Sequence, residues 1–455
     1  MSVKENRSAD STTSGTDKGS TPADGDSTHI PIQFHPERLV ADAKRVVVRP
    51  FELAWNAQGR EPLRARKLIE QICAFSQTEA SVELARVLVE FGERHWQIER
   101  VFERRFTQVA STLDLDESIH TNETLRKLIG AYFCHEYSYA AAALMNPSIV
   151  PHPDQSQLGA GQVRFVMSMR AVGEGHISSI AFREGILKPG PTLALWPASH
   201  PALSAEHVIE LDSPPDRVCV ERNRDSTIGN SVIFPITEAQ RNGLEDLRLV
   251  RFTHDDGAME WIGTYTAYSG QGIRSELLRT RDFRRFELAP LRGAAATNKG
   301  MALFPRKVNG NYLMIGRQDG KQLYLLPSST LYDWESHGTP LAEPRYPWEL
   351  VQIGNCGSPI EIDEGWIVLT HGVGAMRKYS IGAMLLARDD PSRVLGRTAR
   401  PILMAAEAER DGYVPNVVYT CGAIKVDDSL FIPYGFADSG IGFMSVRISD
   451  LLGFM

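Results

Sequence analysis

The sequence predicts an all-β five-bladed β-propeller with an N-terminal α-helical extension. Three observations predict it: glycine and proline become frequent after residue 146, apolar runs shorten to strand length with alternating polarity, and a unit of three to four strands recurs about five times. No crossover helix follows these units, so their sheets should be antiparallel, and closure into a ring shields most strand edges. A β-sandwich is the competing fold, but about 310 residues is large for one.

Each predicted repeat follows the same order of elements. An apolar strand is followed by a turn, an aromatic-rich strand, a polar loop, another apolar strand and a closing turn. An incomplete first copy covers residues 162–182, and the later copies begin at Leu249, Ala302, Pro359 and Gly422.

Two segments of different character precede the repeats. Residues 1–29 contain no Leu, Ile, Phe, Tyr or Trp and are rich in Ser, Thr, Asp and Gly, which predicts a disordered tail. Residues 30–145 show helical periodicity, with helices expected over 61–75, over 84–106 and over 122–145. The chain therefore divides into a tail (1–29), a helical region (30–145) and a catalytic propeller (146–455).

Composition excludes several classes of protein. The chain has 455 residues with 49 Lys plus Arg against 56 Asp plus Glu, and a net charge of -7 argues against a general nucleic-acid binder. Five widely spaced cysteines without a CxxC pair argue against a disulfide scaffold or zinc site and favour a cytoplasmic location. We expect no secretory signal, no membrane span, no metal and no nucleotide cofactor.

The segment Gly243–Arg248 carries the strongest candidate for chemistry. Glu245 and Asp246 open an otherwise apolar strand, and strand alternation directs two adjacent side chains to opposite faces. One carboxylate can therefore pair with an arginine while the other faces the central funnel. A surface turn with a salt bridge is the alternative explanation for an isolated motif of this kind.

Basic side chains occupy comparable places in other repeats. Convergence of such cations on one face near a carboxylate predicts an anion site for phosphate or a carboxylated substrate. The residues are Arg274 before an outer strand, Lys299 before an inner strand, Arg317 at a strand end and His371 one unit later.

Polar and aromatic loop residues complete a predicted sugar pocket. Aromatic rings can stack on pyranose faces, and carboxylates or amides bind pairs of hydroxyl groups. For each residue alone, ordinary loop chemistry is the alternative. The set comprises Asn146, Arg170, His176, Asn416, Tyr434 and Asp438.

From about residue 146 to 452 the chain resembles glycoside hydrolase family 130, the mannoside phosphorylases and their hydrolase relatives, whose fold is a five-bladed propeller. One departure is Leu247, which stands where the family pattern usually has proline. The motifs that carry the resemblance are Asn146–Ser148, Gly243–Arg248, Asn298–Lys299 ahead of Ala302–Val308, His371–Val373, Tyr379–Ala383, Val414–Val418 and Tyr434–Asp438.

The resemblance implies inverting cleavage of short β-mannosides by inorganic phosphate, a co-substrate, to give α-mannose 1-phosphate. It implies that Asp246 is the general acid and that its proton reaches the glycosidic oxygen through a hydroxyl of the bound sugar. A phosphorylase needs no protein base, because phosphate is already an anion that cations can hold in line. Arg274, Lys299, Arg317 and His371 suit that role.

Two other functions stay open. A β-mannosidase on the same scaffold would lack the phosphate ligands and would activate water with a carboxylate, for which Glu174 and Glu364 are candidates. A non-catalytic propeller would bind glycans or proteins without turnover. The helical region would either complete the pocket rim or mediate assembly into a homo-oligomer. The linkage and the acceptor sugar are not predicted.

Overall fold

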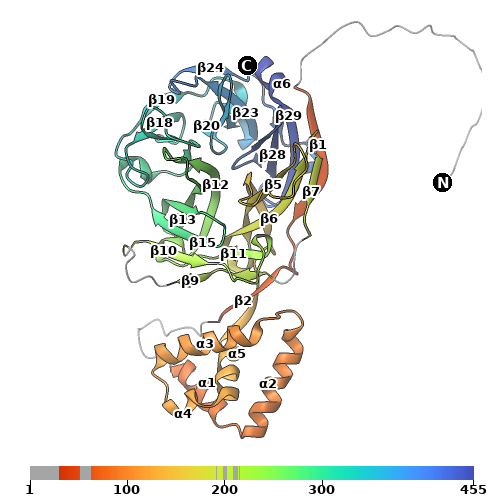
Figure 1. Ribbon diagram of the computed structural model, residues 1–455, viewed down its shortest axis with the longest axis vertical. Helices are drawn as coiled ribbons and strands as arrows, with labels where there is room; N and C mark the ends of the chain where they lie inside the picture. The colour runs from red at the N-terminus through yellow and green to blue at the C-terminus, as the bar shows by residue number, and fades with distance from the viewer. Residues whose placement is uncertain (1–29, 52–62, 191, 198–201, 209–213, 215) are drawn as a thin grey trace, which may run out of the picture.

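The computed structural model describes residues 30–51, 63–190, 192–197, 202–208, 214 and 216–455 (Figure 1). A helical part lies at one end of the molecule, and the remainder is built almost entirely of strands. The prediction of an all-β fold with an N-terminal helical part is therefore confirmed. The predicted tail 1–29 lies outside the described residues.

Local signals in the sequence set the ends of the helices. Ser76 and Glu79 form a capping box at the start of α2, in which each side chain accepts a hydrogen bond from the other residue's backbone N–H. Asn122 caps α5 by accepting a hydrogen bond from the N–H of Leu125 at 3.1 Å. The helices of this part are α1 (Leu63–Cys73), α2 (Gln77–Gly92), α3 (Ile98–Leu113), α4 (Glu117–His120) and α5 (Glu123–Tyr132).

The predicted helical region 30–145 differs from the structure at both ends. β1 (Ile32–Val40) is a strand that pairs antiparallel with β29 (Gly440–Arg447) near the end of the chain. β2 (Val46–Pro50) pairs with β3 (Cys134–Ser138), so the helix predicted over 122–145 ends at Tyr132. Residues 46–48 are three consecutive valines, which favour strands because their branched side chains restrict χ1 in a helix. The apolar face predicted over 84–106 is divided between α2 and α3.

The strands β4 to β15 form one sheet made of two groups, which are antiparallel except for the parallel pair of β8 with β11. The groups join where Ser178 and Gly243 make a parallel pair between β6 and β12. The first group contains β4 (Ala143–Pro151), β5 (Val163–Val172), β6 (Ser178–Lys188), β7 (Thr192–Leu195), β8 (Leu203–Ser204) and β11 (Ser231–Ile233). The second contains β12 (Gly243–Thr253), β13 (Met259–Tyr268), β14 (Ile273–Thr280), β15 (Arg285–Pro290), β10 (Val218–Glu221) and β9 (Glu206–Val208).

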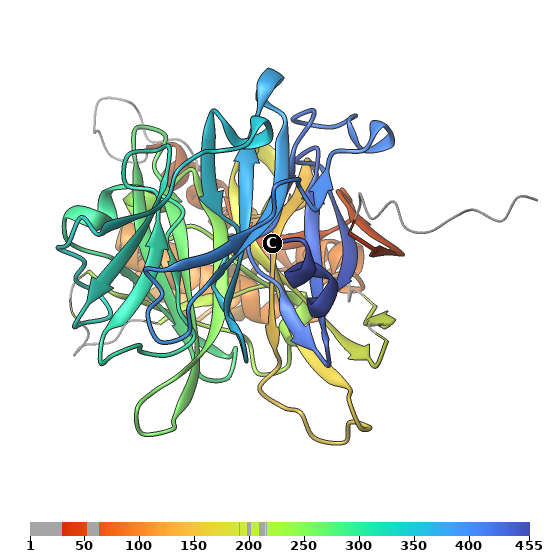
Figure 2. The ribbon, with the colours of Figure 1, turned by 90° about the horizontal axis from the view of Figure 1, so that it is seen from above.

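Three further sheets follow in chain order around the β region (Figures 1 and 2). The third group contains β16 (Ala302–Leu303), β17 (Tyr312–Gly316), β18 (Leu323–Ser328) and β19 (Thr339–Ala342). The fourth contains β20 (Gln352–Asn355), β21 (Ile360–Ile362), β22 (Gly365–Val373), β23 (Tyr379–Leu386), β24 (Val394–Arg397) and β25 (Leu403–Met404). The fifth contains β26 (Val418–Tyr419), β27 (Ile424–Val426), β28 (Ser429–Phe436), β29 and β1, and α6 (Ile448–Gly453) ends the chain.

The hydrophobic core consists of separate clusters between neighbouring groups. Each cluster draws buried side chains from two successive groups, and one joins the fifth group to the first. Buried pairs that share these clusters are Phe182 and Leu249, Phe252 and Leu303, Ile315 and Trp366, Ile381 and Leu430, and Phe443 and Phe165. Because each group packs on the next, the first strand of every group is held close to the others.

The described helices include none that is both long and apolar enough to cross a membrane.

Gly130 allows α5 to pack directly on the backbone of α3. A Cβ atom at this position would lie 2.0 Å from the carbonyl oxygen of Phe102. We expect Gly130→Ala to destabilise the helical part by more than the roughly 1–3 kcal/mol typical of overpacking, because backbone rather than a side chain must move. Circular dichroism at 222 nm during thermal unfolding measures the change.

Gly92→Ala is the matched control, because nothing lies within 4 Å of a Cβ atom there and alanine is the better helix former. Equal melting of the two variants would contradict the packing account.

Candidate active site

A cavity of about 290 Å³ lies where the first strands of the five groups meet. Its lining is dominated by charged and amide side chains, with two tyrosines on one wall. The polar residues are Asn146, Arg170, Glu245, Asp246, Arg248, Lys299, Arg317, Gln352, Asn355, His371, Arg377, Tyr379, Tyr419 and Asp438.

Left-handed backbone bends direct side chains into this cavity. Asn146 in β4 has φ 50° and Asp246 in β12 has φ 56°, and both interrupt the regular register with the next strand. Such conformations cost roughly 1–3 kcal/mol each in residues other than glycine and recur at functional sites. Comparable bends occur at Gly300, Gly357 and Asn416, next to the first strands of the other three groups.

The two bent strands place Asn146 and Asp246 in direct contact. The side-chain amide of Asn146 donates to the Asp246 carboxylate at 2.7 Å, and Arg170 Nη1 lies 3.5 Å from the same oxygen. Burial alone would raise the pKa of Asp246, but the charges of Arg170 and Arg248 and the hydrogen bond from Asn146 outweigh it. The net effect lowers this pKa, so Asp246 is ionised in the unliganded protein.

Glu245 and Asp246 share one arginine. Arg170 donates to Glu245 Oε1 at 2.7 Å and to Ser178 Oγ at 2.9 Å. Burial raises the pKa of Glu245, with a further contribution from the Asp246 charge, although Arg170 opposes both. One arginine cannot fully offset the negative charges of two close carboxylates. Asp246 is therefore ionised in preference to Glu245.

Several buried donors in the cavity have no hydrogen-bond partner. Arg248 is almost fully buried, and its Nη2 donates to the Tyr419 hydroxyl at 2.7 Å while its Nη1 donates to the Asp246 carbonyl at 3.0 Å. The Nε atom of Arg248, the Nε atom of Arg317 and the amide nitrogen of Asn355 are buried without a partner among the described residues. Unmade hydrogen bonds of this kind cost about 1–3 kcal/mol each, so the cluster suits an anion that accepts several of them.

His371 is a neutral member of this cluster. Burial, followed by the nearby charges of Arg317 and Arg248, lowers the pKa of His371 to about 3. Its ring stacks on Tyr379 at 5.9 Å between centroids and meets Tyr419 edge-on at 4.9 Å. His371 was predicted to act as a cation together with Arg274, Lys299 and Arg317. In the structure it is instead a neutral hydrogen-bonding group.

Asp438 is a third carboxyl group in the cavity. It lies in the turn between β28 and β29 with φ 49°. Burial raises the pKa of Asp438 to about 6, and the negative charge of Asp246 adds to the shift, while Arg170 and Arg377 oppose it. The group therefore titrates near neutral pH, unlike Asp246.

The structure brings most of the predicted site residues together, and four lie elsewhere. Asn146, Arg170, Asp246, Lys299, Arg317, His371 and Asp438 line the cavity, but Arg274, His176, Asn416 and Tyr434 do not.

Each of the four has a local reason for its position. Arg274 donates to the buried Glu276, two residues along the same strand face, and is thereby held away from the cavity. Tyr434 is fully buried and donates to Glu409 at 3.0 Å. The carbonyl of Asn416 accepts from the N–H of Tyr379 behind the cavity wall. His176 is exposed and its ring contacts Tyr413.

Sequence reasoning missed a second set of lining residues. Arg248 and Tyr379 lie within motifs that carry the family resemblance, although no role was predicted for them. Tyr419 follows two apolar residues, which give no functional signal. Asn355 could have been found as one more asparagine beside a first strand, like Asn146 and Asn416. The candidate bases Glu174 and Glu364 are not among the lining residues, and neither is any described residue of α1–α5.

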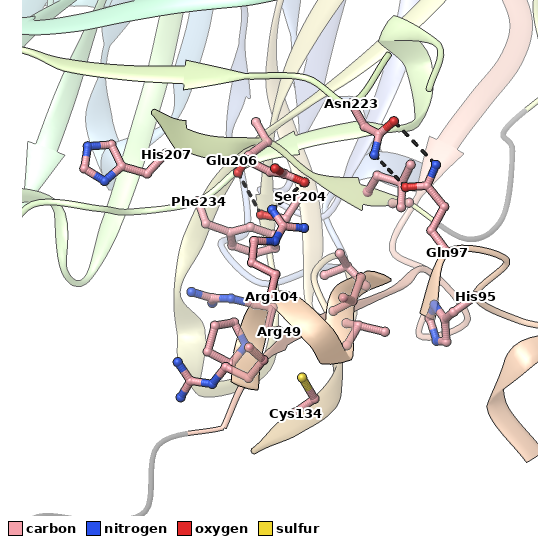
Figure 3. A pocket seen from close by; sticks show the side chains of 18 of the residues that line it. Arg49, His95, Gln97, Arg104, Cys134, Ser204, Glu206, His207, Asn223 and Phe234 are labelled. Atoms are coloured by element: carbon pink, nitrogen blue, oxygen red, sulfur yellow. Dashed lines mark hydrogen bonds and ion pairs between the residues drawn. The ribbon is translucent and has the colours of Figure 1, made fainter. Parts of the chain in front are cut away.

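A separate cavity of about 390 Å³ lies between the helical part and the β region (Figure 3). Arg104 of α3 forms an ion pair with Glu206, and the Asn223 amide donates to Gln97 at 2.5 Å, so polar contacts join the two parts around it. None of the predicted site residues lines this cavity. Among the residues with described positions, no group of three or more His, Cys, Asp and Glu is arranged to hold a metal ion.

Comparison with known proteins identifies relatives over the β region. The family model described as beta-1,4-mannooligosaccharide phosphorylase matches residues 208–455. The 1,2-beta-oligomannan phosphorylase of Thermoanaerobacter sp. (strain X514) is 33% identical over 226 residues, which is 47% of this chain and 72% of that protein. The beta-1,2-mannobiose phosphorylase of Listeria innocua is 31% identical over 226 residues, covering 48% of this chain and 62% of the relative.

A solved structure supports the fold. It accompanies the finding that the GH130 family of mannoside phosphorylases contains glycoside hydrolases that target β-1,2 mannosidic linkages in Candida mannan. Its TM-score to this chain is 0.50 at 17% identity, covering 69% of this chain and 87% of that one. At this identity the likeness concerns the fold alone.

The raised pKa of Asp438 predicts a pH-dependent stability difference. The unfolded carboxyl ionises near its ordinary value of 3.8, whereas the folded one ionises near 6, so its contribution to stability is lost as pH rises between these values. Asp438→Asn removes that loss and keeps the left-handed backbone, which asparagine tolerates. We expect the variant to gain stability relative to the native protein as pH rises from 4.5 to 7.5, by about 2 kcal/mol, because part of the loss has already occurred at pH 4.5.

Urea unfolding followed by tryptophan fluorescence at the two pH values measures this gain. A difference between the variant and the native protein that does not change with pH would contradict the assignment.

Proposed function

The chain belongs to glycoside hydrolase family 130, and we propose that it is an inverting phosphorylase that cleaves short β-mannosides with inorganic phosphate to α-mannose 1-phosphate. The observation that carries the proposal is the cavity itself. The cavity combines a largely buried aspartate with cations that have unused hydrogen-bond donors. Phosphorolysis requires this pairing of a proton donor with an anion site.

The proposal includes a five-bladed β-propeller as the scaffold. Five mainly antiparallel groups support it, as do the buried clusters between all neighbouring pairs, including the fifth and the first. Pairing of β1 with β29 would close the ring, because it joins the two ends of the described chain within one group. Closure would leave the central cavity as the place where all five groups contribute residues.

Phosphate would bind at the wall formed by Lys299, Arg317 and Arg248. Burial and the adjacent Arg248 lower the pKa of Arg317, which reflects the cost of crowding positive charges without an anion between them. A phosphate dianion would offset that repulsion and accept from the unpaired Nε atoms and from Asn355. It would also favour protonation of His371, whose Nδ1 is buried without a partner among the described residues.

Asp246 would supply the proton to the leaving sugar. In the unliganded protein its pKa is lowered by Arg170 and Arg248, which outweigh burial, so the proton must be acquired on formation of the ternary complex. Bound phosphate would oppose the field of these cations and so favour the protonated acid. Asn146, Arg170 and Asp438 surround the carboxylate and would hold the mannosyl hydroxyl groups, one of which relays the proton.

Hydrolysis is the alternative chemistry on this scaffold. An inverting hydrolase needs a second carboxylate that activates water across the sugar ring. Glu245 is committed to Arg170, and Glu174 and Glu364 do not line the cavity. Asp438 does line it, but we assign it to the mannosyl hydroxyl groups. We also propose a cytoplasmic location for either activity, because the five cysteines are widely spaced and include no CxxC pair.

A phosphate-dependence assay tests the proposal. The protein is incubated with β-1,2- or β-1,4-mannobiose with and without phosphate, and the products are identified by anion-exchange chromatography. We expect α-mannose 1-phosphate only with phosphate, and free mannose at equal rates in both conditions would instead establish a hydrolase. We expect Asp246→Asn to lower kcat by about 10²–10⁴-fold, the usual contribution of a general acid, while sugar binding persists.

Asp427→Asn is the matched control for Asp246→Asn. Asp427 is also a left-handed aspartate, with φ 52°, but it lies in the turn between β27 and β28, away from the cavity lining. Its substitution should leave the rate unchanged. An unaffected rate in Asp246→Asn would remove Asp246 from the role of acid.

A further inference from the structure

Two aromatic rings from different groups meet close to residues of the cavity wall. His176 lies in the turn between β5 and β6, and Tyr413 lies in the loop that precedes β26. Their ring centroids are 6.0 Å apart with planes inclined by 30°, and Tyr413 is 60% exposed. A large aromatic side chain held in place yet open to solvent is typical of a contact surface for a ligand.

Backbone contacts attach this ring pair to the cavity. The N–H of Val414 donates to the carbonyl of Ala437 at 2.9 Å, which fixes Tyr413 beside the turn that carries Asp438. His176 is two residues from Ser178, whose hydroxyl accepts from Arg170. The ring pair therefore lies next to Asp438 and Arg170, two residues of the cavity wall.

The charges in the cavity determine which part of a substrate would reach the rings. Lys299, Arg317 and Asn355 belong to the third and fourth groups, whereas His176 and Tyr413 belong to the first and fifth. In an inverting displacement the nucleophile and the leaving group occupy opposite faces of the anomeric carbon. A phosphate held by the cations therefore leaves the departing sugar on the side of the first and fifth groups.

We infer that His176 and Tyr413 form a stacking platform for the neutral pyranose that leaves, on the acceptor side of the cleaved bond. This inference rests on the proposed function, because phosphate and the acid assign the two sides. The apolar C–H face of a pyranose matches a ring surface, and the contact adds affinity without demanding one hydroxyl pattern. The platform would also extend along a longer β-mannoside.

Ring-removing substitutions test the platform. At position 413 the variants are Tyr413→Ala and the ring-retaining Tyr413→Phe. At position 176 the variant is His176→Asn, since asparagine tolerates the local φ of 59°. Initial rates of phosphorolysis are measured with mannobiose and mannotriose at saturating phosphate, and with phosphate varied at saturating sugar. Trp96→Ala is the control, because Trp96 is an exposed aromatic of the helical part outside the cavity lining.

We expect Tyr413→Ala and His176→Asn to raise KM for the mannosides by about 2- to 12-fold, the range for one aromatic contact of about 0.5–1.5 kcal/mol. The KM for phosphate should stay unchanged, and Tyr413→Phe and Trp96→Ala should match the native protein. Unchanged KM for the mannosides in Tyr413→Ala, or a parallel rise in KM for phosphate, would overturn the inference while leaving the phosphorylase proposal intact.

A binding measurement separates failure of this inference from failure of the proposed function. If the native protein shows no phosphate-dependent turnover, the proposed function fails, and calorimetric titration with β-1,2-mannotriose then tests the platform alone. Weaker binding by Tyr413→Ala than by Tyr413→Phe supports a stacking platform. Equal binding by the two variants, or no binding by the native protein, overturns it.

Discussion

The hydrogen bond between Asn146 and Asp246 is the contact on which the geometry of the site depends. Both residues have positive φ, and each interrupts the first strand of its group, so neither side chain would reach the other from a regular strand. The left-handed conformations are unfavourable locally and persist because the clusters on either side fix both strands. Packing between groups therefore holds the carboxylate in place.

Charge balance in the cavity follows from that placement. Arg170 and Arg248 flank Asp246 and keep it ionised, while the same burial keeps His371 neutral and raises the pKa of Asp438. The cavity concentrates cations whose positive charges are only partly offset by carboxylates. The unpaired donors of Arg248 and Arg317 further reduce the stability of the folded protein. Binding sites of this kind lower the stability of the unliganded protein, and a bound anion restores part of that stability.

Local pattern explains why much of the fold was predictable and why β1, one of three strands that lie wholly within the predicted helical region, was not. Period-two alternation and recurring turns are visible within each group, so the strands after residue 143 could be expected. β1 could not, because its partner lies about four hundred residues away: His35 pairs in register with Phe443 and donates or accepts through its ring with Ser445. The spacing of apolar residues indicates which face of a segment is buried, but it does not indicate which distant strand pairs with that segment. A left-handed bend alone does not identify a site residue, because Asn146 and Asp246 line the cavity whereas Asn416 and His176 do not.

Arg274 was predicted to bind phosphate, but a pattern of charges in the sequence does not show that it pairs with Glu276. In a strand, residues two positions apart share a face, so Glu276 lies where it can form an ion pair with Arg274. Arg317 is also followed two residues later by a carboxylate, but Asp319 lies beyond the end of β17 and accepts from the backbone N–H groups of Lys321 and Gln322. The Nε of Arg317 remains unpaired among the described residues. The difference between a structural and a functional arginine thus lies in whether the chain supplies a carboxylate on the same face. Arg248 follows Asp246 by two residues, but the left-handed bend at Asp246 interrupts the strand, and the guanidinium donates to the Tyr419 hydroxyl and to the Asp246 carbonyl rather than to a carboxylate.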